Sequence, residues 1–262
     1  MFKLTGRAAI VTGAGGGIGQ GIAHALADAG ATVFVAEIDR DAGAACAEAI
    51  RAAGHRAHFV HTDVTSRASL EALVDTAVRE AGRLDILVNN AWRGRGLARV
   101  EALDDDALEG GFTMAVLAAQ RLMRAAFPHL KAGGCGRVIS LCSLNGVNAH
   151  LYSADYNAAK EALRALTRSA AREWAEYGIC CNVICPGAAS EAYRRFAETN
   201  PDNAARIAQA NPMGRVGDPL ADIAPVAVFL AGDASRYLTG NTLFVDGGAH
   251  INGVAWAPAR PA

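Results

Sequence analysis

Short apolar runs alternate with amphipathic segments along almost the whole chain, and this alternation constrains the fold more than any other feature. The apolar runs have the length and aliphatic character of buried strands, and the segments between them have the apolar spacing of helices. The sequence predicts strands over residues 7–13, 31–37, 56–64, 84–90, 136–143, 179–187 and 242–248. It predicts helices over residues 17–30, 40–54, 69–82, 104–133, 155–178 and 222–235.

Strands that alternate with helices favour a parallel sheet whose right-handed crossovers place helices on both faces. No linker interrupts the pattern, so we expect a single doubly wound α/β domain over residues 1–262, with a parallel seven-stranded sheet. In such a sheet, ligands bind beyond the carboxyl ends of the strands. Candidate functional residues are therefore those that directly follow the predicted strands.

The composition excludes several classes of function. The formal net charge of the 262 residues is -1, which gives no general affinity for nucleic acid or for an anionic membrane surface. No apolar segment has the length of a membrane span, and no signal-peptide core precedes the first strand, so we expect a cytoplasmic protein. The six cysteines form no C-x-x-C pair with zinc spacing, so we expect no metal.

A glycine-rich turn follows the first predicted strand and opens the first predicted helix. The stretch "TGAGGGIG" contains Gly13, Gly17 and Gly19, whose main chain can approach a pyrophosphate at the positive end of the helix. Glu37 ends the second predicted strand, where a carboxylate accepts hydrogen bonds from ribose hydroxyls and repels a 2′-phosphate. This arrangement predicts NAD as the cofactor, with Arg40 as the one nearby cation that would favour NADP.

The stretch "LYSADYNAAKEAL" places Tyr152, Tyr156 and Lys160 at intervals of four. Residues four apart share one face of a helix, so Lys160 would lie one turn from Tyr156. By spacing alone, the ordinary interpretation is a packed ring beside a solvated charge. The alternative is a tyrosine whose acidity is tuned by the lysine.

Several short motifs occur in a fixed order: "TGAGGGIG", "TDV", "NNA", "SLCS", "YNAAK", "CNVICPG" and "VDGG". In order and spacing they resemble the classical short-chain dehydrogenases/reductases over nearly the whole chain. The resemblance implies a Rossmann-type fold and an NAD-dependent alcohol dehydrogenase or ketone reductase. It implies that Tyr156 exchanges a proton with the substrate oxygen, that Ser143 orients this oxygen, and that Lys160 binds the nicotinamide ribose and favours tyrosinate.

The resemblance also assigns residues to the cofactor. Poising a tyrosine near neutrality requires a shift of ~3 pKa units, or ~4 kcal/mol, which nearby positive charges could supply. The cofactor-binding residues implied by the motifs are Gly13, Gly17, Ile18, Gly19, Glu37, Asp63, Val64, Asn90, Tyr156, Lys160, Pro186 and Gly187.

Two positions depart from the family pattern. Ala115 stands where the family has an active-site asparagine, whose freed main-chain carbonyl holds a water in the proton relay. We expect Gly110 and Gly111 to loosen the helix instead, so that the enzyme stays active. Trp92 stands where "NNAG" usually has its glycine, and it is followed by Arg93 and Arg95, which are candidates to bind a polar substrate group.

Residues 188–215 are expected to form a substrate lid. An apolar substrate pocket is predicted from the side chains of Trp92, Leu144, His150, Tyr152, Tyr193 and Phe196. These residues favour a cyclic or aromatic secondary alcohol as substrate, and ordinary loop packing is the alternative.

Other functions stay open at this point. One is a dinucleotide-binding protein that has reduced or lost turnover, which the missing asparagine motivates. Another is a non-redox lyase or dehalogenase on the same fold, although Glu37 and the glycine turn keep a dinucleotide site. By resemblance alone we expect a homotetramer that acts on a small molecule, with the tail over residues 251–262 reaching a neighbouring subunit.

Overall fold

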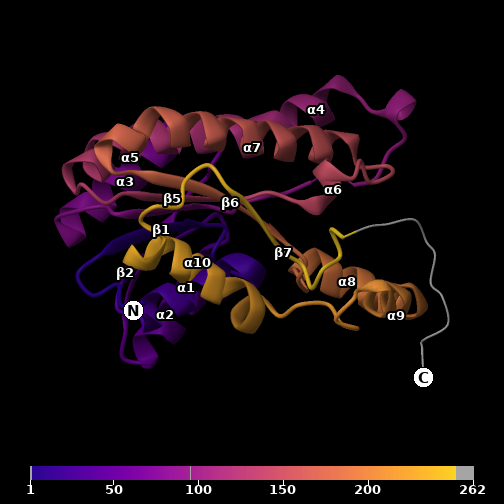
Figure 1. The fold of residues 1–262 in the computed structure, drawn as a ribbon, viewed down its shortest axis with the longest axis horizontal. Helices are drawn as coiled ribbons and strands as arrows, with labels where there is room; N and C mark the ends of the chain where they lie inside the picture. The colour runs from indigo at the N-terminus through magenta and orange to yellow at the C-terminus, as the bar shows by residue number, and fades with distance from the viewer. Residues whose placement is uncertain (1, 95, 252–262) are drawn as a thin grey trace.

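The computed structural model describes residues 2–94 and 96–251, and its central element is a parallel seven-stranded sheet (Figure 1). The strand order is β3-β2-β1-β4-β5-β6-β7, and every neighbouring pair is parallel. The chain therefore winds outward in one direction from β1 to β3 and in the other direction from β4 to β7. The strands are β1 Ala8–Thr12, β2 Thr32–Glu37, β3 Arg56–His61, β4 Ile86–Asn89, β5 Arg137–Leu141, β6 Cys180–Pro186 and β7 Thr242–Val245.

The helices in the described part of the chain follow the predicted alternation, apart from the short helix α6, which the sequence does not predict, and three differences in predicted segments. Their bounds are α1 Gly17–Asp28, α2 Arg40–Ala52, α3 Arg67–Ala81, α4 Asp105–Phe112, α5 Ala118–Ala132, α6 Leu144–Val147, α7 Ala154–Trp174, α8 Glu191–Thr199, α9 Pro201–Ala210 and α10 Ala224–Ala231.

The first difference is in the helix predicted over residues 104–133, which is wrong as one regular helix. A π-helical turn, η2 (Thr113–Leu117), separates α4 from α5. The second is the segment predicted as a loop lid over residues 188–215, which contains the helices α8 and α9. The third is the helix predicted over residues 222–235, which consists of a π-helical turn, α10 and a 3-10 turn, Asp233–Ser235.

The two faces of the sheet are covered by different helices (Figure 1). Side chains alternate along a strand, so Val11 packs with Ile22 of α1 and Ile50 of α2, whereas its neighbour Ile10 packs on the other face. That other face carries α3, α5 and α7, and α10 lies on the face of α1. Both halves of the core are apolar because strands buried on both faces have no solvated side.

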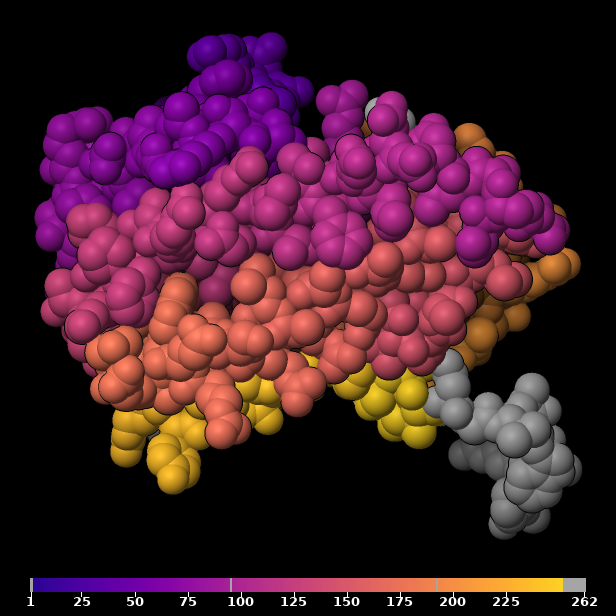
Figure 2. All heavy atoms as spheres, turned by 90° about the horizontal axis from the view of Figure 1, so that it is seen from above, coloured from indigo at the N-terminus to yellow at the C-terminus, as the bar shows by residue number. Residues whose placement is uncertain are grey.

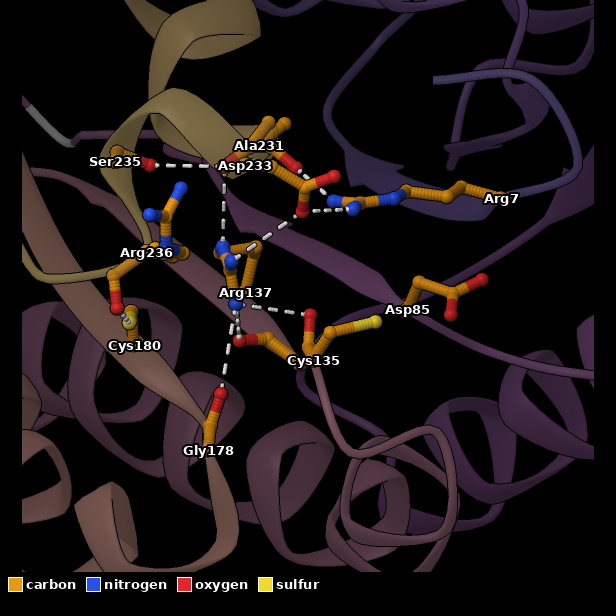
Figure 3. Close-up of polar contacts among 12 residues, drawn as sticks. Arg7, Asp85, Cys135, Arg137, Gly178, Cys180, Ala231, Asp233, Ser235 and Arg236 are labelled. Atoms are coloured by element: carbon orange, nitrogen blue, oxygen red, sulfur yellow. Dashed lines mark hydrogen bonds and ion pairs between the residues drawn. The ribbon is translucent and has the colours of Figure 1, made fainter. Parts of the chain in front are cut away.

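Arg137 links several loops at the amino ends of the strands (Figure 3). Its guanidinium is buried and donates hydrogen bonds of 2.9 Å to the carbonyl oxygens of Cys135 and Gly136. It also contacts the loop after α10 through the Gly232 carbonyl and the Asp233 carboxylate, which pairs in turn with Arg7. This cluster is structural, because it lies at the opposite end of the strands from the residues predicted to be functional.

The carboxyl ends of the strands lead into the functional segments. Figure 1 shows α6, which follows β5, and α8, which follows β6, at the same end of the molecule as α9. None of the described helices is long and apolar enough to cross a membrane. Within residues 2–94 and 96–251, no three His, Cys, Asp or Glu side chains are grouped so as to hold a metal ion.

Candidate active site

The glycine-rich turn between β1 and α1 forms one wall of the candidate site. Gly13 and Gly17 have φ values of 64° and 55°, which residues with a Cβ rarely adopt. A Cβ on Gly19 would lie 2.2 Å from the carbonyl oxygen of Gly13, so the close approach requires glycine. The helix α1 begins without a side-chain cap and without an acidic residue in its first turn, so its first N–H groups suit an anion. Ile18 packs its side chain against the core.

Asn90 fixes the conformation of this turn from the neighbouring strand. Its amide nitrogen donates hydrogen bonds of 2.9 and 3.0 Å to the carbonyl oxygens of Thr12 and Gly13. The Thr12 hydroxyl in turn accepts from the main-chain N–H groups of Asn90 and Ala91. The side chain predicted to lie beside the cofactor is therefore also the brace that ties β4 to the glycine turn.

Glu37 lies at the carboxyl end of β2 with its carboxylate held by main-chain donors. One oxygen accepts from the N–H of Gly15 at 3.0 Å, and the other accepts from Ile38 at 2.8 Å and Asp39 at 3.2 Å. The negative charge is therefore fixed directly beside the glycine turn. Arg40 is exposed at the start of α2, where Asp39 caps the helix.

The remaining residues assigned to the cofactor follow β3 and β6. Asp63 is half-buried and accepts hydrogen bonds from the main chain and the hydroxyl of Thr65. Val64 packs its side chain against the apolar core on the α3 face. Pro186 ends β6, and a Cβ on Gly187 would lie 2.7 Å from Asp246, so Gly187 allows close contact with the segment after β7.

Ser143 and Tyr156 are brought together although they belong to different elements. Ser143 follows β5 and caps the short helix α6, where its hydroxyl accepts from the N–H of Asn145 at 3.1 Å. Tyr156 lies in the first turn of α7. Burial raises the pKa of Tyr156, and a hydrogen bond with Ser143 opposes this rise without cancelling it. The phenol therefore holds its proton at neutral pH in the protein alone.

Lys160 lies one turn after Tyr156 and is 3% exposed. Its ammonium donates to the carbonyl oxygen of Leu141 at 2.8 Å and lies 5.7 Å from the ring centroid of Tyr156. Burial lowers the pKa of Lys160. The helical spacing thus predicts the proximity of the two side chains correctly, whereas the bond to Leu141 has no signal in the sequence.

Trp92 packs directly on this pair. Its indole meets the Tyr156 ring edge-on, with ring centroids 4.9 Å apart, and the Lys160 ammonium lies 5.3 Å from the indole centroid. The position predicted as a substrate wall therefore contacts the candidate acid itself. An ammonium near an indole face is attracted by the ring, which adds to the packing.

The helix after β4 breaks at Ala115, as expected from the glycines one turn upstream. Ala115 lies within the π-helical turn η2 and borders a small cavity of about 20 Å³ beside Asn89. The amide nitrogen of Asn89 is buried and has no hydrogen-bond partner among the described residues. A cavity of this size holds one water molecule, and Asn89 is the polar side chain available to bind it. Thr113, the polar side chain nearest to Ala115 in sequence, borders a different cavity.

The residues predicted to contact substrate from the segment between β5 and α7 are dispersed. Leu144 is half-buried in α6, whereas His150 and Tyr152 are exposed. Tyr152 precedes α7, in agreement with the helix predicted from residue 155, so its spacing of four from Tyr156 is not helical. Tyr152 has a φ of 64°, a strained conformation for a bulky side chain, while its carbonyl accepts from the N–H of Ala98 at 2.8 Å.

Tyr193 and Phe196 pack within the α8–α9 pair. Their ring centroids are 6.2 Å apart, and the Tyr193 hydroxyl donates to the carbonyl oxygen of Ala204 in α9. Both side chains are half-buried. They hold the two helices together, which gives the lid region an apolar centre of its own.

Arg93 borders a cavity of about 480 Å³ next to Trp92. The same cavity is bordered by Asp106, Glu109 and the buried Asp155, so its walls carry both signs of charge. Arg95, the other arginine considered for a polar substrate group, lies outside the described residues, as does the chain from residue 252 to 262.

Comparison with known proteins agrees with this geometry. The family described as enoyl-(acyl carrier protein) reductase matches residues 13–250. The rabbit (Oryctolagus cuniculus) L-fucose dehydrogenase is 36% identical over 95% of this chain and 87% of its own length. The cis-4-hydroxycyclohexanecarboxylate dehydrogenase of Sinomonas cyclohexanicum is 38% identical over 92% of this chain and 96% of its own length.

Two solved structures are similar over almost the whole fold. A 7α-hydroxysteroid dehydrogenase complexed with NADH and 7-oxo glycochenodeoxycholic acid has a TM-score of 0.89 and 33% identity, over 94% of this chain and 95% of its own. A gluconate 5-dehydrogenase of Burkholderia cenocepacia J2315, in complex with NADP and tartrate, has a TM-score of 0.89 and 33% identity, over 96% of this chain and 98% of its own. Together with the order of the strands and the motifs at their carboxyl ends, these matches show that the chain belongs to the short-chain dehydrogenase/reductase family of oxidoreductases.

Proposed function

We propose that the protein is an NAD-dependent alcohol dehydrogenase or ketone reductase that acts on a secondary alcohol or its ketone. The observation that carries the proposal is the meeting of Ser143, Tyr156 and Lys160 at the carboxyl ends of the strands. These groups lie beside a glycine turn whose open N–H groups, together with the fixed carboxylate of Glu37, suit a dinucleotide. When bound, the nicotinamide supplies or accepts the hydride.

Tyr156 is the proposed acid and base. In the direction of ketone reduction its hydroxyl gives a proton to the carbonyl oxygen, and in the direction of alcohol oxidation its oxygen takes a proton from the hydroxyl. The Ser143 hydroxyl lies close enough to Tyr156 to lower the pKa of the phenol, so it can donate to the same substrate oxygen and hold it in line. Lys160 is proposed to bind the ribose hydroxyls and to favour the ionised phenol through its charge.

Because the pKa of Tyr156 is raised, alcohol oxidation requires a further group that stabilises the tyrosinate. The protein alone keeps the phenol protonated, which suits reduction, because burial disfavours the anion more than Ser143 stabilises it. Oxidation requires the tyrosinate, and a positive charge close to the phenol would stabilise it. Lys160 is the nearest cationic side chain in the described site, and Trp92 shields this pair from water.

The proposed substrate is a cyclic or aromatic secondary alcohol of fairly apolar character. Trp92 supports this proposal by placing an aromatic surface beside Tyr156, and the α8–α9 pair adds Tyr193 and Phe196 to the region after β6. Two of the similar proteins are named for hydroxylated rings, a hydroxycyclohexanecarboxylate and a hydroxysteroid.

A panel of alcohols with NAD, followed by absorbance of the reduced cofactor, tests the function. We expect turnover with ring-bearing secondary alcohols. Tyr156→Phe is expected to lower kcat by ~10²–10⁴-fold, as for loss of a general acid–base group, while binding of NADH is retained. Tyr152→Phe is the matched control, because Tyr152 lies outside α7 and is half exposed. Substantial activity in Tyr156→Phe would assign the proton transfer to another group.

The two other classes of function give different results in the same assay. A protein that only binds dinucleotide would change NADH fluorescence without turnover of any alcohol. A lyase or dehalogenase on this fold would convert its substrate without consuming NAD. The intact group of Ser143, Tyr156 and Lys160 supports the oxidoreductase over both.

We also propose a cytoplasmic homotetramer of single-domain subunits, each with a lid over residues 188–215. Figure 2 shows the face on which α4 and α7 lie side by side, which we propose to be one subunit interface. Leu108, Phe112 and Leu117 are exposed on α4 and η2, and an interface would bury them. Sedimentation at micromolar concentration should give a tetramer, and Phe112→Glu should shift it towards smaller species. A monomeric wild-type protein would contradict the proposal.

A further inference from the structure

We infer that Glu191, at the start of α8, weakens the binding of the dinucleotide by placing a carboxylate against the glycine turn that receives the pyrophosphate. This inference rests on the proposed dinucleotide site and adds a residue that sets its affinity. Nothing in the glycine motif itself indicates it, because Glu191 belongs to the segment after β6.

The start of α8 lies directly on the glycine turn. A Cβ built on Gly17 would lie 3.5 Å from the main-chain nitrogen of Glu191 and 4.0 Å from the Cα of Ser190. A Cβ built on Gly16 would lie 3.2 Å from a carboxylate oxygen, Oε2, of Glu191. The carboxylate therefore lies against the part of the turn whose main chain is uncovered because the glycines have no side chains.

The electrostatics at the start of α1 favour an anion, and Glu191 is an anion that the chain places there in addition to Glu37, which lies on the Gly15 side of the turn. The first turn of α1 contains no acidic residue, and its cap residue, Gly16, has no side chain that could accept from the first N–H groups. Its free N–H groups and the positive end of the helix attract negative charge. A bound pyrophosphate would use the same N–H groups, so the two negative groups compete for one position and repel each other.

Glu191 is held loosely enough to be displaced. Its other oxygen, Oε1, lies 3.5 Å from the guanidinium of Arg195 one turn further along α8. Both side chains are well exposed, at 64% for Glu191 and 71% for Arg195, and exposed pairs of this kind are weak. A dinucleotide can therefore enter, but its binding must turn the Glu191 carboxylate away. The negative charge of Glu191 then stays near the phosphates and repels them.

A comparison of charge-neutral variants by direct binding tests the inference. NADH and NADPH are each titrated into the wild type, Glu191→Gln and Glu198→Gln, with nucleotide fluorescence as the signal. Glu198 is the matched control, because it is exposed on the same helix near its other end. We expect Glu191→Gln to bind NADH about fivefold more tightly than the wild type, with a slower dissociation rate, and Glu198→Gln to bind as the wild type does.

The salt dependence supplies a second readout. Repulsion between exposed charges is screened by salt, so the difference between wild type and Glu191→Gln should shrink as the salt concentration rises. Equal affinity of the wild type and Glu191→Gln at low salt, or weaker binding by the variant, would overturn the inference and leave the dinucleotide site intact. Failure of every variant to bind either nucleotide would overturn the proposed function as well.

Discussion

At the scale of single residues, the carboxylate of Glu37 carries the proposed preference for NAD. Three main-chain N–H groups hold this side chain at the end of β2, beside Gly15. Such a fixed charge can accept hydrogen bonds from ribose hydroxyls and repels a phosphate in the same place. Arg40, the cation that could offset this repulsion, is exposed at the start of the next helix.

We expect the wild type to prefer NAD over NADP in kcat/KM. Glu37→Ala should lower kcat/KM with NAD by ~10–100-fold, because hydrogen bonds to a charged group contribute ~1.5–3 kcal/mol. Glu37→Gln is the matched variant, because it keeps an acceptor and removes the charge. Glu37→Gln should lower kcat/KM with NAD less than Glu37→Ala does, and it should reduce the ratio of kcat/KM with NAD to kcat/KM with NADP. A wild type that prefers NADP would contradict this role of Glu37 and point to Arg40.

At the scale of elements, the π-helical turn Thr113–Leu117 forms although Ala115 stands in place of the asparagine of the family pattern. Alanine has no side-chain donor or acceptor, yet the helix breaks at Ala115. Gly110 and Gly111 lie immediately upstream, and glycine lowers helix stability by ~1 kcal/mol relative to alanine, which makes a local change of hydrogen bonding less costly. Asn89, whose amide nitrogen has no hydrogen-bond partner within the described part of the chain, borders the cavity beside the turn.

We predict that the native turn supports the proton relay without an asparagine. Ala115→Asn should therefore change kcat by less than tenfold. A hundredfold rise would mean that the native site lacks ~2.7 kcal/mol of transition-state stabilisation, and the interpretation of a compensated turn would then be wrong. Gly110→Ala is the companion variant: a Cβ there meets no neighbouring atom, so a fall in kcat would show that this glycine acts by loosening the helix. Steady-state kinetics and a high-resolution structure of both variants provide the measurement.

At the scale of the whole molecule, the two ends of the sheet have separate tasks. Arg137 ties the amino ends of the strands to the segments around Gly178 and Gly232, and Asp233 adds an ion pair with Arg7 (Figure 3). The residues proposed for catalysis lie at the carboxyl ends. A change at one end should therefore affect stability without affecting the chemistry at the other.

Arg137→Met should destabilise the protein and leave kcat unchanged at temperatures where it stays folded. The half-buried carbonyl group of Cys135 would lose its donor, at a cost of ~1–3 kcal/mol, whereas the Gly136 carbonyl would keep the N–H of Cys180 as a donor. Asp233→Asn is the control, because that side chain is 67% exposed and its pairs should contribute ~1 kcal/mol or less. Thermal unfolding measures both variants, and equal Tm values would contradict the structural role of Arg137.

Much of the fold follows from local patterns in the sequence. The apolar runs that become β1 to β7 predict a parallel sheet because strands buried on both faces need apolar side chains throughout. The spacing of Tyr156 and Lys160 places them on adjacent turns of one helix, as observed. The ends of elements are less certain from sequence, because a cap such as Ser66 of α3 competes with neighbours like Ser69.

The sequence by itself therefore determines the order of strands and helices, the glycine turn, and the helical pairing of Tyr156 with Lys160. These depend on periodicity and on spacing within one element or one turn. Only the tertiary structure decides that Trp92 packs on Tyr156, that Asn90 locks the glycine turn, and that Glu191 lies against Gly16. Such contacts join residues far apart in the chain, so they depend on how the helices and loops pack around the sheet rather than on any local pattern.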